Sequence, residues 1–194
     1  DAHLMINEPV KHVHDYIDAG SDIITVHAEV CDESSFGEIC DMLNSNQVGI
    51  GLAINPDTEL PQWCYKFVEL LDQVIIMSVV PGKSGQKFIE STHEKTRRIA
   101  KDLREHKFEG YIEVDGGVNL ENIGACFEDG ARAFVGGSAI IGQNDVRMII
   151  KEFRNQVLES RRRLLIKKAH DLGGTELVNS WIDLHVIGEK KDKL

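Results

Sequence analysis

The chain has 194 residues, of which 42% are hydrophobic and 28% charged, as in ordinary globular domains with one sizeable core. Lys and Arg number 22 against 32 Asp and Glu, and the resulting net charge of −10 disfavours nucleic-acid binding, because phosphate backbones select a basic face. We expect a cytoplasmic protein without membrane contact, since no apolar run reaches the ~18 residues of a span and no signal-peptide pattern opens the chain.

Short apolar runs rich in β-branched residues alternate with longer amphipathic runs, a pattern that predicts an α/β fold. The predicted strands cover residues 2–6, 23–26, 48–52, 73–77, 111–114 and 133–135. The predicted helices cover residues 10–19, 34–43, 61–71, 90–106, 120–129 and 144–168. Most strands are apolar at successive positions, which favours a parallel sheet buried on both faces. The alternation alone leaves open whether the sheet is doubly wound or part of a (β/α)8 barrel.

The last part of the chain has a different composition. Residues 1–158 carry the strand–helix alternation, and residues 159–194 are predicted to form a helical extension or tail, with a further apolar segment at 177–187 after Gly173-Gly174. Its charged residues are interpreted as a solvated face and a frayed end, with an anion-binding patch as the alternative, and no function is assigned to the tail. The four cysteines (Cys31, Cys40, Cys64 and Cys126) show no Cys-x-x-Cys spacing, so we expect reduced thiols.

Glycine-rich loops follow two predicted strands. Pro81-Gly82-Lys83-Ser84-Gly85 comes shortly after strand 73–77, and Gly136-Gly137-Ser138 comes directly after strand 133–135. Backbone N–H groups in such loops, and at the start of a helix, can surround an anion. The loops therefore predict a site for a small phosphorylated molecule, although each alone could be a tight connection between elements.

A carboxylate and two histidines occupy comparable strand ends. Asp115 directly follows strand 111–114 and is a candidate general base or metal ligand, because Asn119 is better placed to cap the following helix. His3 and His27 also lie near strand ends, where they either converge with Asp115 on one metal or substrate or are satisfied core residues. The segment Asn55-Pro56-Asp57-Thr58 is predicted to be a turn. The other histidines are expected at the surface: His12, His14, His93, His106, His170 and His185.

Together these segments resemble the ribulose-phosphate 3-epimerase family of (β/α)8 barrel enzymes, from Asp1 to about Asp145. The resemblance is carried, in the family's order, by Asp1-Ala2-His3-Leu4-Met5-Ile6, Ile24-Thr25-Val26-His27-Ala28-Glu29, Ala53-Ile54-Asn55-Pro56-Asp57-Thr58, Ile76-Met77-Ser78-Val79-Val80-Pro81-Gly82, Gly85-Gln86-Lys87-Phe88, Glu113-Val114-Asp115-Gly116-Gly117-Val118-Asn119 and Gly137-Ser138-Ala139-Ile140. It implies a TIM barrel of which this chain covers roughly strands three to eight.

The resemblance also implies roles for individual residues. His3 and Asp115 would bind one divalent metal ion (Zn, Fe, Mn or Co), and Asp115 would be one of two acid/base carboxylates. His27 and Glu29 would be supporting residues. The substrate-binding residues implied are His3, Met5, Met77, Gly82, Lys83, Ser84, Gly85, Gly116, Gly117, Gly137 and Ser138. Of these, the methionines would form apolar walls and the glycine loops would hold the phosphate.

The activity implied is that of an isomerase of the pentose phosphate pathway, in carbohydrate metabolism. Such an enzyme interconverts D-ribulose 5-phosphate and D-xylulose 5-phosphate by removing the C3 proton and returning one to the opposite face. A metal ion that polarises the carbonyl would stabilise the enediolate, and two carboxylates would exchange the roles of base and acid. By family analogy we expect a homo-oligomer.

The chain departs from the family in two respects. Val80, Lys83 and Ser84 replace an asparagine and an aromatic-glycine pair of the usual phosphate loop. Family members also have two earlier βα units, whose His-x-Asp pair supplies two metal ligands and the second carboxylate. We therefore expect the chain to lack roughly 65 to 75 residues of a whole barrel and to be inactive alone. Two other readings stay open: a related enzyme on a six-carbon sugar phosphate, of the allulose-phosphate epimerase or hexulose-phosphate synthase type, or a non-catalytic phosphosugar-binding homologue.

Overall fold

A computed structural model describes residues 1–82 and 85–171 of the chain. Within these residues the strands form a single parallel sheet of six strands: β1 (Ala2–Leu4), β2 (Ile23–His27), β3 (Gly49–Ile54), β4 (Gln73–Met77), β5 (Tyr111–Asp115) and β6 (Ala133–Val135). Each strand coincides with a predicted one to within a few residues, so the strand predictions are confirmed.

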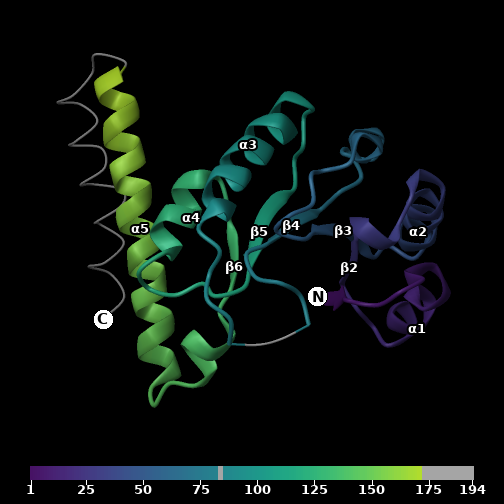
Figure 1. Ribbon diagram of the computed structural model, residues 1–194, viewed down its shortest axis with the longest axis horizontal. Helices are drawn as coiled ribbons and strands as arrows, with labels where there is room; N and C mark the ends of the chain where they lie inside the picture. Colours follow the sequence, from purple (N-terminus) through teal and green to yellow (C-terminus); the bar gives the residue numbers. More distant parts are fainter. Residues whose placement is uncertain (83–84, 172–194) are drawn as a thin grey trace.

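The helical segments lie around the strands (Figure 1). They are η1 (Pro9–Lys11), α1 (Val13–Asp18), η2 (Ala28–Val30), α2 (Glu33–Ser45), η3 (Gln62–Lys66), α3 (Ser91–Glu105), α4 (Ile123–Asp129), η4 (Gly137–Ile141) and α5 (Val146–Asp171). In Figure 1, α1 and α2 lie at one end of the sheet and α4 and α5 at the other.

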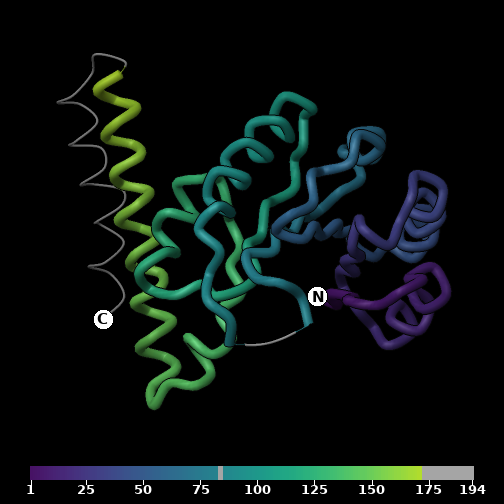
Figure 2. Tube along the Cα trace, in the orientation of Figure 1, coloured from purple at the N-terminus to yellow at the C-terminus, as the bar shows by residue number. Residues whose placement is uncertain are grey.

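The order of the strands distinguishes a barrel from a doubly wound sheet. Each strand pairs with the next in the sequence, from β1 through to β6, and every pair is parallel. The chain therefore advances across the sheet in one direction, as the tube in Figure 2 shows from purple to yellow. A doubly wound sheet reverses direction at a switch point, whereas a barrel does not. The sheet is thus part of a (β/α)8 barrel.

Residues Val74 to Met77 of β4 are buried apolar residues on both faces of the sheet, since alternate side chains of a strand point to opposite faces. On β4, Val74 and Ile76 belong to the large core between the strands and the helices. Ile75 and Met77 belong to a small inner cluster with Ala53 and Val79. Burial on both sides explains why the strand sequences are continuous apolar runs and do not alternate strictly between apolar and polar residues.

Two helix predictions are corrected by the structure. The segment predicted as helix 10–19 consists of η1 and α1, two short pieces that meet at His12. The segment predicted as helix 61–71 contains only the short 3-10 helix η3. There Trp63 and Phe67 pack against Phe36 of α2, with ring centroids 5.2 and 5.3 Å from that of Phe36. We attribute the short helix to this aromatic packing, which fixes the segment without a continuous helix.

Helix α5 is continuous from Val146 to Asp171 and matches the helix predicted over 144–168. The domain boundary predicted at residue 158 falls inside α5 and stays a prediction, and the predicted segment 177–187 lies outside the described residues. No helix in residues 1–82 or 85–171 is long and apolar enough to cross a membrane. All four cysteines lie in those residues and are free thiols.

Candidate active site

Loops from three neighbouring strands enclose a cavity of about 310 Å³ at the carboxyl ends of β4, β5 and β6. This is the end of the sheet where barrel enzymes carry their active sites. The lining includes Asp115, the predicted catalytic residue, and eight of the predicted substrate-binding residues: Met5, Met77, Gly82, Gly85, Gly116, Gly117, Gly137 and Ser138. Lys83 and Ser84 lie outside the described residues. The predicted residues therefore gather around one space, and their roles stay predictions.

The turn after β5 is built from two glycines with left-handed backbone. Gly116 has φ of 119° and Gly117 has φ of 63°. A Cβ on Gly117 would lie 2.5 Å from the backbone nitrogen of Phe88, so no larger residue fits there. The buried Ser78 hydroxyl donates to the carbonyl oxygens of Asp115, at 3.0 Å, and Gly116, at 2.5 Å. This turn holds the backbone beside Asp115 in one conformation.

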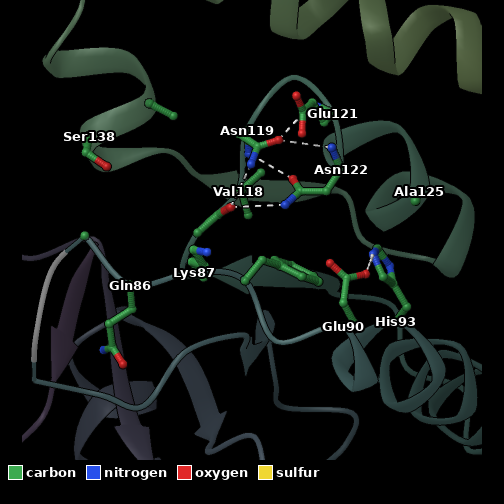
Figure 3. Close-up of a pocket in the computed structure, with 14 residues that line it drawn as sticks. Gln86, Lys87, Glu90, His93, Val118, Asn119, Glu121, Asn122, Ala125 and Ser138 are labelled. Atoms are coloured by element: carbon green, nitrogen blue, oxygen red, sulfur yellow. Dashed lines mark hydrogen bonds and ion pairs between the residues drawn. The ribbon is translucent and has the colours of Figure 1, made fainter.

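Asparagine side chains hold the chain beyond this turn, and the Asp115 carboxylate takes no part in their hydrogen bonds. The Asn119 side-chain oxygen accepts from the backbone N–H groups of Glu121, at 2.8 Å, and Asn122, at 3.2 Å. The Asn122 side-chain oxygen accepts in return from the Asn119 backbone N–H at 2.8 Å, and Figure 3 shows the two side chains facing each other. These bonds hold the turn before α4 (Ile123–Asp129), whose N-cap residue is Asn122 without a side-chain capping hydrogen bond, so the prediction that Asn119 caps a helix beginning at residue 120 is corrected.

A second cavity of about 740 Å³ adjoins the first and shares Gly85, Gln86, Gly117 and Ser138 with it (Figure 3). His93 lines this cavity and corrects an expectation, because its side chain is largely buried rather than on the surface. Its Nδ1 lies 2.5 Å from the Asp129 carboxylate, which Arg97 also contacts at 3.1 Å. These pairs join α3 to the end of α4, which the sequence did not reveal because the partners are 36 positions apart.

His3 and Asp115 face each other across the inner side of the sheet. The Nδ1 atom of His3 lies 3.5 Å from Oδ2 of Asp115. A divalent ion at about 2.1 Å from a nitrogen and an oxygen ligand, with a tetrahedral angle between them, separates the two ligands by about 3.4 Å. The pair therefore fits as two ligands of one metal ion. Within the described residues no group of three or more His, Cys, Asp or Glu side chains is arranged to hold a metal.

The other ring nitrogen of His3 contacts a second histidine. Nε2 of His3 lies 2.9 Å from Nε2 of His27, and Nδ1 of His27 lies 3.2 Å from Oε2 of Glu29. Burial acts to raise the pKa of Glu29, but hydrogen bonds from His27, Thr58 and the Asn55 backbone outweigh it and lower the pKa to about 2. His27 and Glu29 thus lie directly behind His3, and the segment predicted as a turn holds Glu29.

Sequence reasoning assigned no role to Glu113, which lies two positions before Asp115 on β5. Burial, and then the negative charge of Asp115, raise the pKa of Glu113 to about 7. The i, i+2 spacing along a strand places both carboxylates on the inner face. That spacing was the available signal, since acidic residues two apart in a strand share one side.

The fold and the cavity define a partial (β/α)8 barrel with glycine-rich loops at the carboxyl ends of its strands. Comparisons with known proteins identify the family within this class of barrels. Residues 1–141 match the model of the "Ribulose-phosphate 3 epimerase family". The chain belongs to this family.

Two relatives and one solved structure illustrate the similarity. The ribulose-phosphate 3-epimerase of Escherichia coli (strain K12) is 38% identical over 157 residues, which cover 81% of this chain and 68% of the relative. That of Bacillus subtilis (strain 168) is 39% identical over 155 residues, covering 79% and 70%. The 3-hexulose-6-phosphate synthase of Salmonella typhimurium superposes with a TM-score of 0.58 at 17% identity, over 79% of this chain and 70% of that one, which indicates a shared fold.

Proposed function

We propose that this protein is a metal-assisted ribulose-phosphate 3-epimerase that interconverts D-ribulose 5-phosphate and D-xylulose 5-phosphate. The observation that carries the proposal is the position of Asp115, which lines the 310 Å³ cavity while its carboxylate faces His3 at 3.5 Å. Family membership supports the same activity.

Asp115 is the proposed acid/base group on one face of the sugar. As a carboxylate at the cavity wall it takes the proton from C3, or returns one, in the enediolate mechanism. The buried Met77 pairs with Asp115 in the register of β4 and β5 and, with Met5, gives the cavity an apolar side that excludes water. Excluding water strengthens the electrostatic effect of the carboxylate on the reacting carbon.

The backbone of the glycine turns is the proposed phosphate-binding element. Gly116, Gly117, Gly137 and Ser138 line the cavity together, and turns of this kind present N–H groups to an anion without needing a basic side chain. The net charge of −10 opposes binding of larger polyanions. Local backbone N–H groups can still bind a small phosphate, so a site of this design suits an acidic protein.

His3 and Asp115 are the proposed ligands of one divalent metal ion, and their separation fits that role. When bound, the ion would polarise the substrate carbonyl and stabilise negative charge that develops beside C3. Imidazole and carboxylate ligands suit Zn, Fe, Mn and Co alike.

The test replaces Asp115 by asparagine, which keeps the shape of the side chain and removes its basicity. The measurement is the rate at which the C3 proton of ribulose 5-phosphate exchanges with deuterium from solvent, followed by NMR with the protein in the form that its cells make. We expect Asp115→Asn to slow this exchange by about 10²- to 10⁴-fold. Asp41→Asn, at an exposed position of α2, is the control and should retain full exchange. Exchange at the control rate in Asp115→Asn would remove Asp115 from the mechanism.

Substrate preference separates this proposal from that of a six-carbon enzyme. We expect kcat/KM for ribulose 5-phosphate to exceed that for allulose 6-phosphate and other six-carbon sugar phosphates. Greater turnover of a six-carbon substrate would replace the pentose assignment by that of a related barrel enzyme.

One observation favours a second candidate, a phosphosugar-binding protein without catalysis. Among the described residues that line the 310 Å³ cavity, Asp115 is the only carboxylate, whereas inversion at C3 needs a proton donor on the opposite face. For such a protein we expect ribulose 5-phosphate to bind without any solvent exchange at C3.

A further inference from the structure

A line of side chains runs from the metal-facing side of His3 toward the loop after β3. Nε2 of His3 contacts Nε2 of His27 at 2.9 Å, and Nδ1 of His27 contacts Oε2 of Glu29 at 3.2 Å. The two imidazole planes differ by 12° and their centroids are 5.0 Å apart. Nearly parallel rings whose nitrogens meet at hydrogen-bonding distance allow the N–H of one ring to point at the lone pair of the other.

The far end of this line is fixed. The other oxygen of Glu29 accepts from the Asn55 backbone N–H at 2.6 Å. Lys95 of α3 in turn donates to the carbonyl oxygens of Asn55, at 2.5 Å, and Pro56, at 3.2 Å. The loop after β3 therefore holds the Glu29 carboxylate in place, and a buried lysine holds the loop.

An ionised Glu29 sets the direction of every hydrogen bond in the line. A carboxylate only accepts, so the Nδ1 atom of His27 carries a proton and donates to it. A neutral imidazole has one N–H, which leaves Nε2 of His27 as an acceptor for the Nε2–H of His3. The Nδ1 lone pair of His3 is then free on the side of Asp115.

Asp115 competes for the same proton of His3. Its Oδ2 lies 3.5 Å from Nδ1 of His3, close enough that small movements would let a protonated Nδ1 donate to it. A histidine beside a carboxylate alone favours that tautomer, since charge-assisted hydrogen bonds are the stronger ones. A proton on Nδ1 would block this nitrogen as a metal ligand, because metals bind the unprotonated ring nitrogen.

We propose that His27 and Glu29 are positioning residues that fix the Nε2–H tautomer of His3 and so keep its Nδ1 lone pair open to the metal ion shared with Asp115. The metal part of this inference rests on the proposed function, whereas the tautomer is a property of the metal-free chain. Carboxylate partners behind a metal-binding histidine commonly act in this way. Here the carboxylate acts through an intervening imidazole.

Nitrogen-15 NMR of the metal-free 194-residue chain tests the tautomer directly, at about pH 8, where ordinary histidines are neutral. We expect His3 to carry its proton on Nε2 and His27 on Nδ1. In His27→Phe, which removes the acceptor and keeps a ring, we expect the His3 proton to move to Nδ1. His27→Gln restores an acceptor and should return the proton to Nε2. A His3 proton on Nδ1, or on both nitrogens, in the unsubstituted chain would overturn the proposal without any variant having to fold.

Metal affinity tests the consequence, in the form of the protein that its cells make. We expect His27→Phe to weaken Zn²⁺ binding about 10- to 100-fold, measured by calorimetry, and His27→Gln to recover most of the loss. His93→Phe is the matched control, because it also breaks a buried histidine–carboxylate pair, but away from His3. Unchanged Zn²⁺ affinity in a folded His27→Phe protein would overturn the positioning role. If the unsubstituted protein shows the expected tautomer but binds no Zn²⁺, the proposed function fails and the tautomer assignment stands.

Discussion

The carboxylate of Glu29 is partly buried yet ionised, because four hydrogen bonds favour its charged form. Its pKa is about 2 against an ordinary value of 4.5, so the folded state binds this proton less readily than the unfolded state does. The resulting stabilisation is fully present above about pH 4.5 and is lost as the pH falls toward 2. We expect Glu29→Gln to remove about 1–2 kcal/mol of this pH-dependent stability, after allowance for the solvent-facing part of the carboxylate.

Urea unfolding at a series of pH values measures this effect. Between pH 4.5 and 2, the free energy of unfolding should fall less steeply in Glu29→Gln than in the unsubstituted chain. Glu121→Gln, at an exposed position of the turn before α4, should follow the unsubstituted curve. Parallel curves for Glu29→Gln and the unsubstituted chain would show that the hydrogen bonds to Glu29 do not favour its charged form.

Single residues differ in how far the sequence reveals their surroundings. The strand positions leave open whether His3 converges with Asp115 or is a satisfied core residue, and the structure places the two side chains 3.5 Å apart. The line from His3 through His27 to Glu29 was not predictable, because it depends on how rings from two strands tilt toward each other. The ion pair of His93 with Asp129 was missed for the same reason, since side chains on two helices meet there.

Helix α2 begins with a reciprocal cap that the sequence Asp32-Glu33-Ser34-Ser35 encodes locally. The Asp32 carboxylate accepts from the Ser35 backbone N–H at 2.8 Å, and the Ser35 hydroxyl oxygen accepts from the Asp32 backbone N–H at 2.9 Å. Both N–H groups would otherwise lack partners at the start of the helix. We expect Asp32→Ala to lower the free energy of unfolding by about 1 kcal/mol in urea titrations. Asp41→Ala, farther along the same helix, should change it by less than about 0.5 kcal/mol; an equal loss in both variants would contradict the capping role.

Elements were predictable where the signal was local. All the strands followed from short β-branched runs, and α3 and α5 from their length and helical spacing. The helix prediction over 61–71 was wrong because this segment is fixed by aromatic contacts with α2, which helical periodicity does not encode. The choice between a barrel and a doubly wound sheet needed the strand order, which is a property of the whole chain.

At the scale of the whole molecule, the described residues leave both ends of the sheet open and expose several apolar side chains. In this part of the chain β1 pairs only with β2, and β6 only with β5. Among the exposed apolar side chains described after β6, Ile141 at 79% exposure and Met148 at 57% are the most exposed. Open strand edges favour association by strand pairing, and exposed apolar side chains favour it by removing apolar surface from water.

We therefore expect the 194-residue chain to self-associate as its concentration rises, which size-exclusion chromatography with light scattering measures. Replacing both Ile141 and Met148 by lysine should shift the mass toward that of a monomer, because two charges would then have to be buried in the contact. Leu70→Lys is the control, since Leu70 is 46% exposed but lies in the segment between η3 and β4, on another part of the molecule. A chain that stays monomeric throughout would contradict the prediction. If only Leu70→Lys shifts the mass toward that of a monomer, the contact lies in the segment between η3 and β4. The expected homo-oligomer would then associate through a surface other than the one that includes Ile141 and Met148.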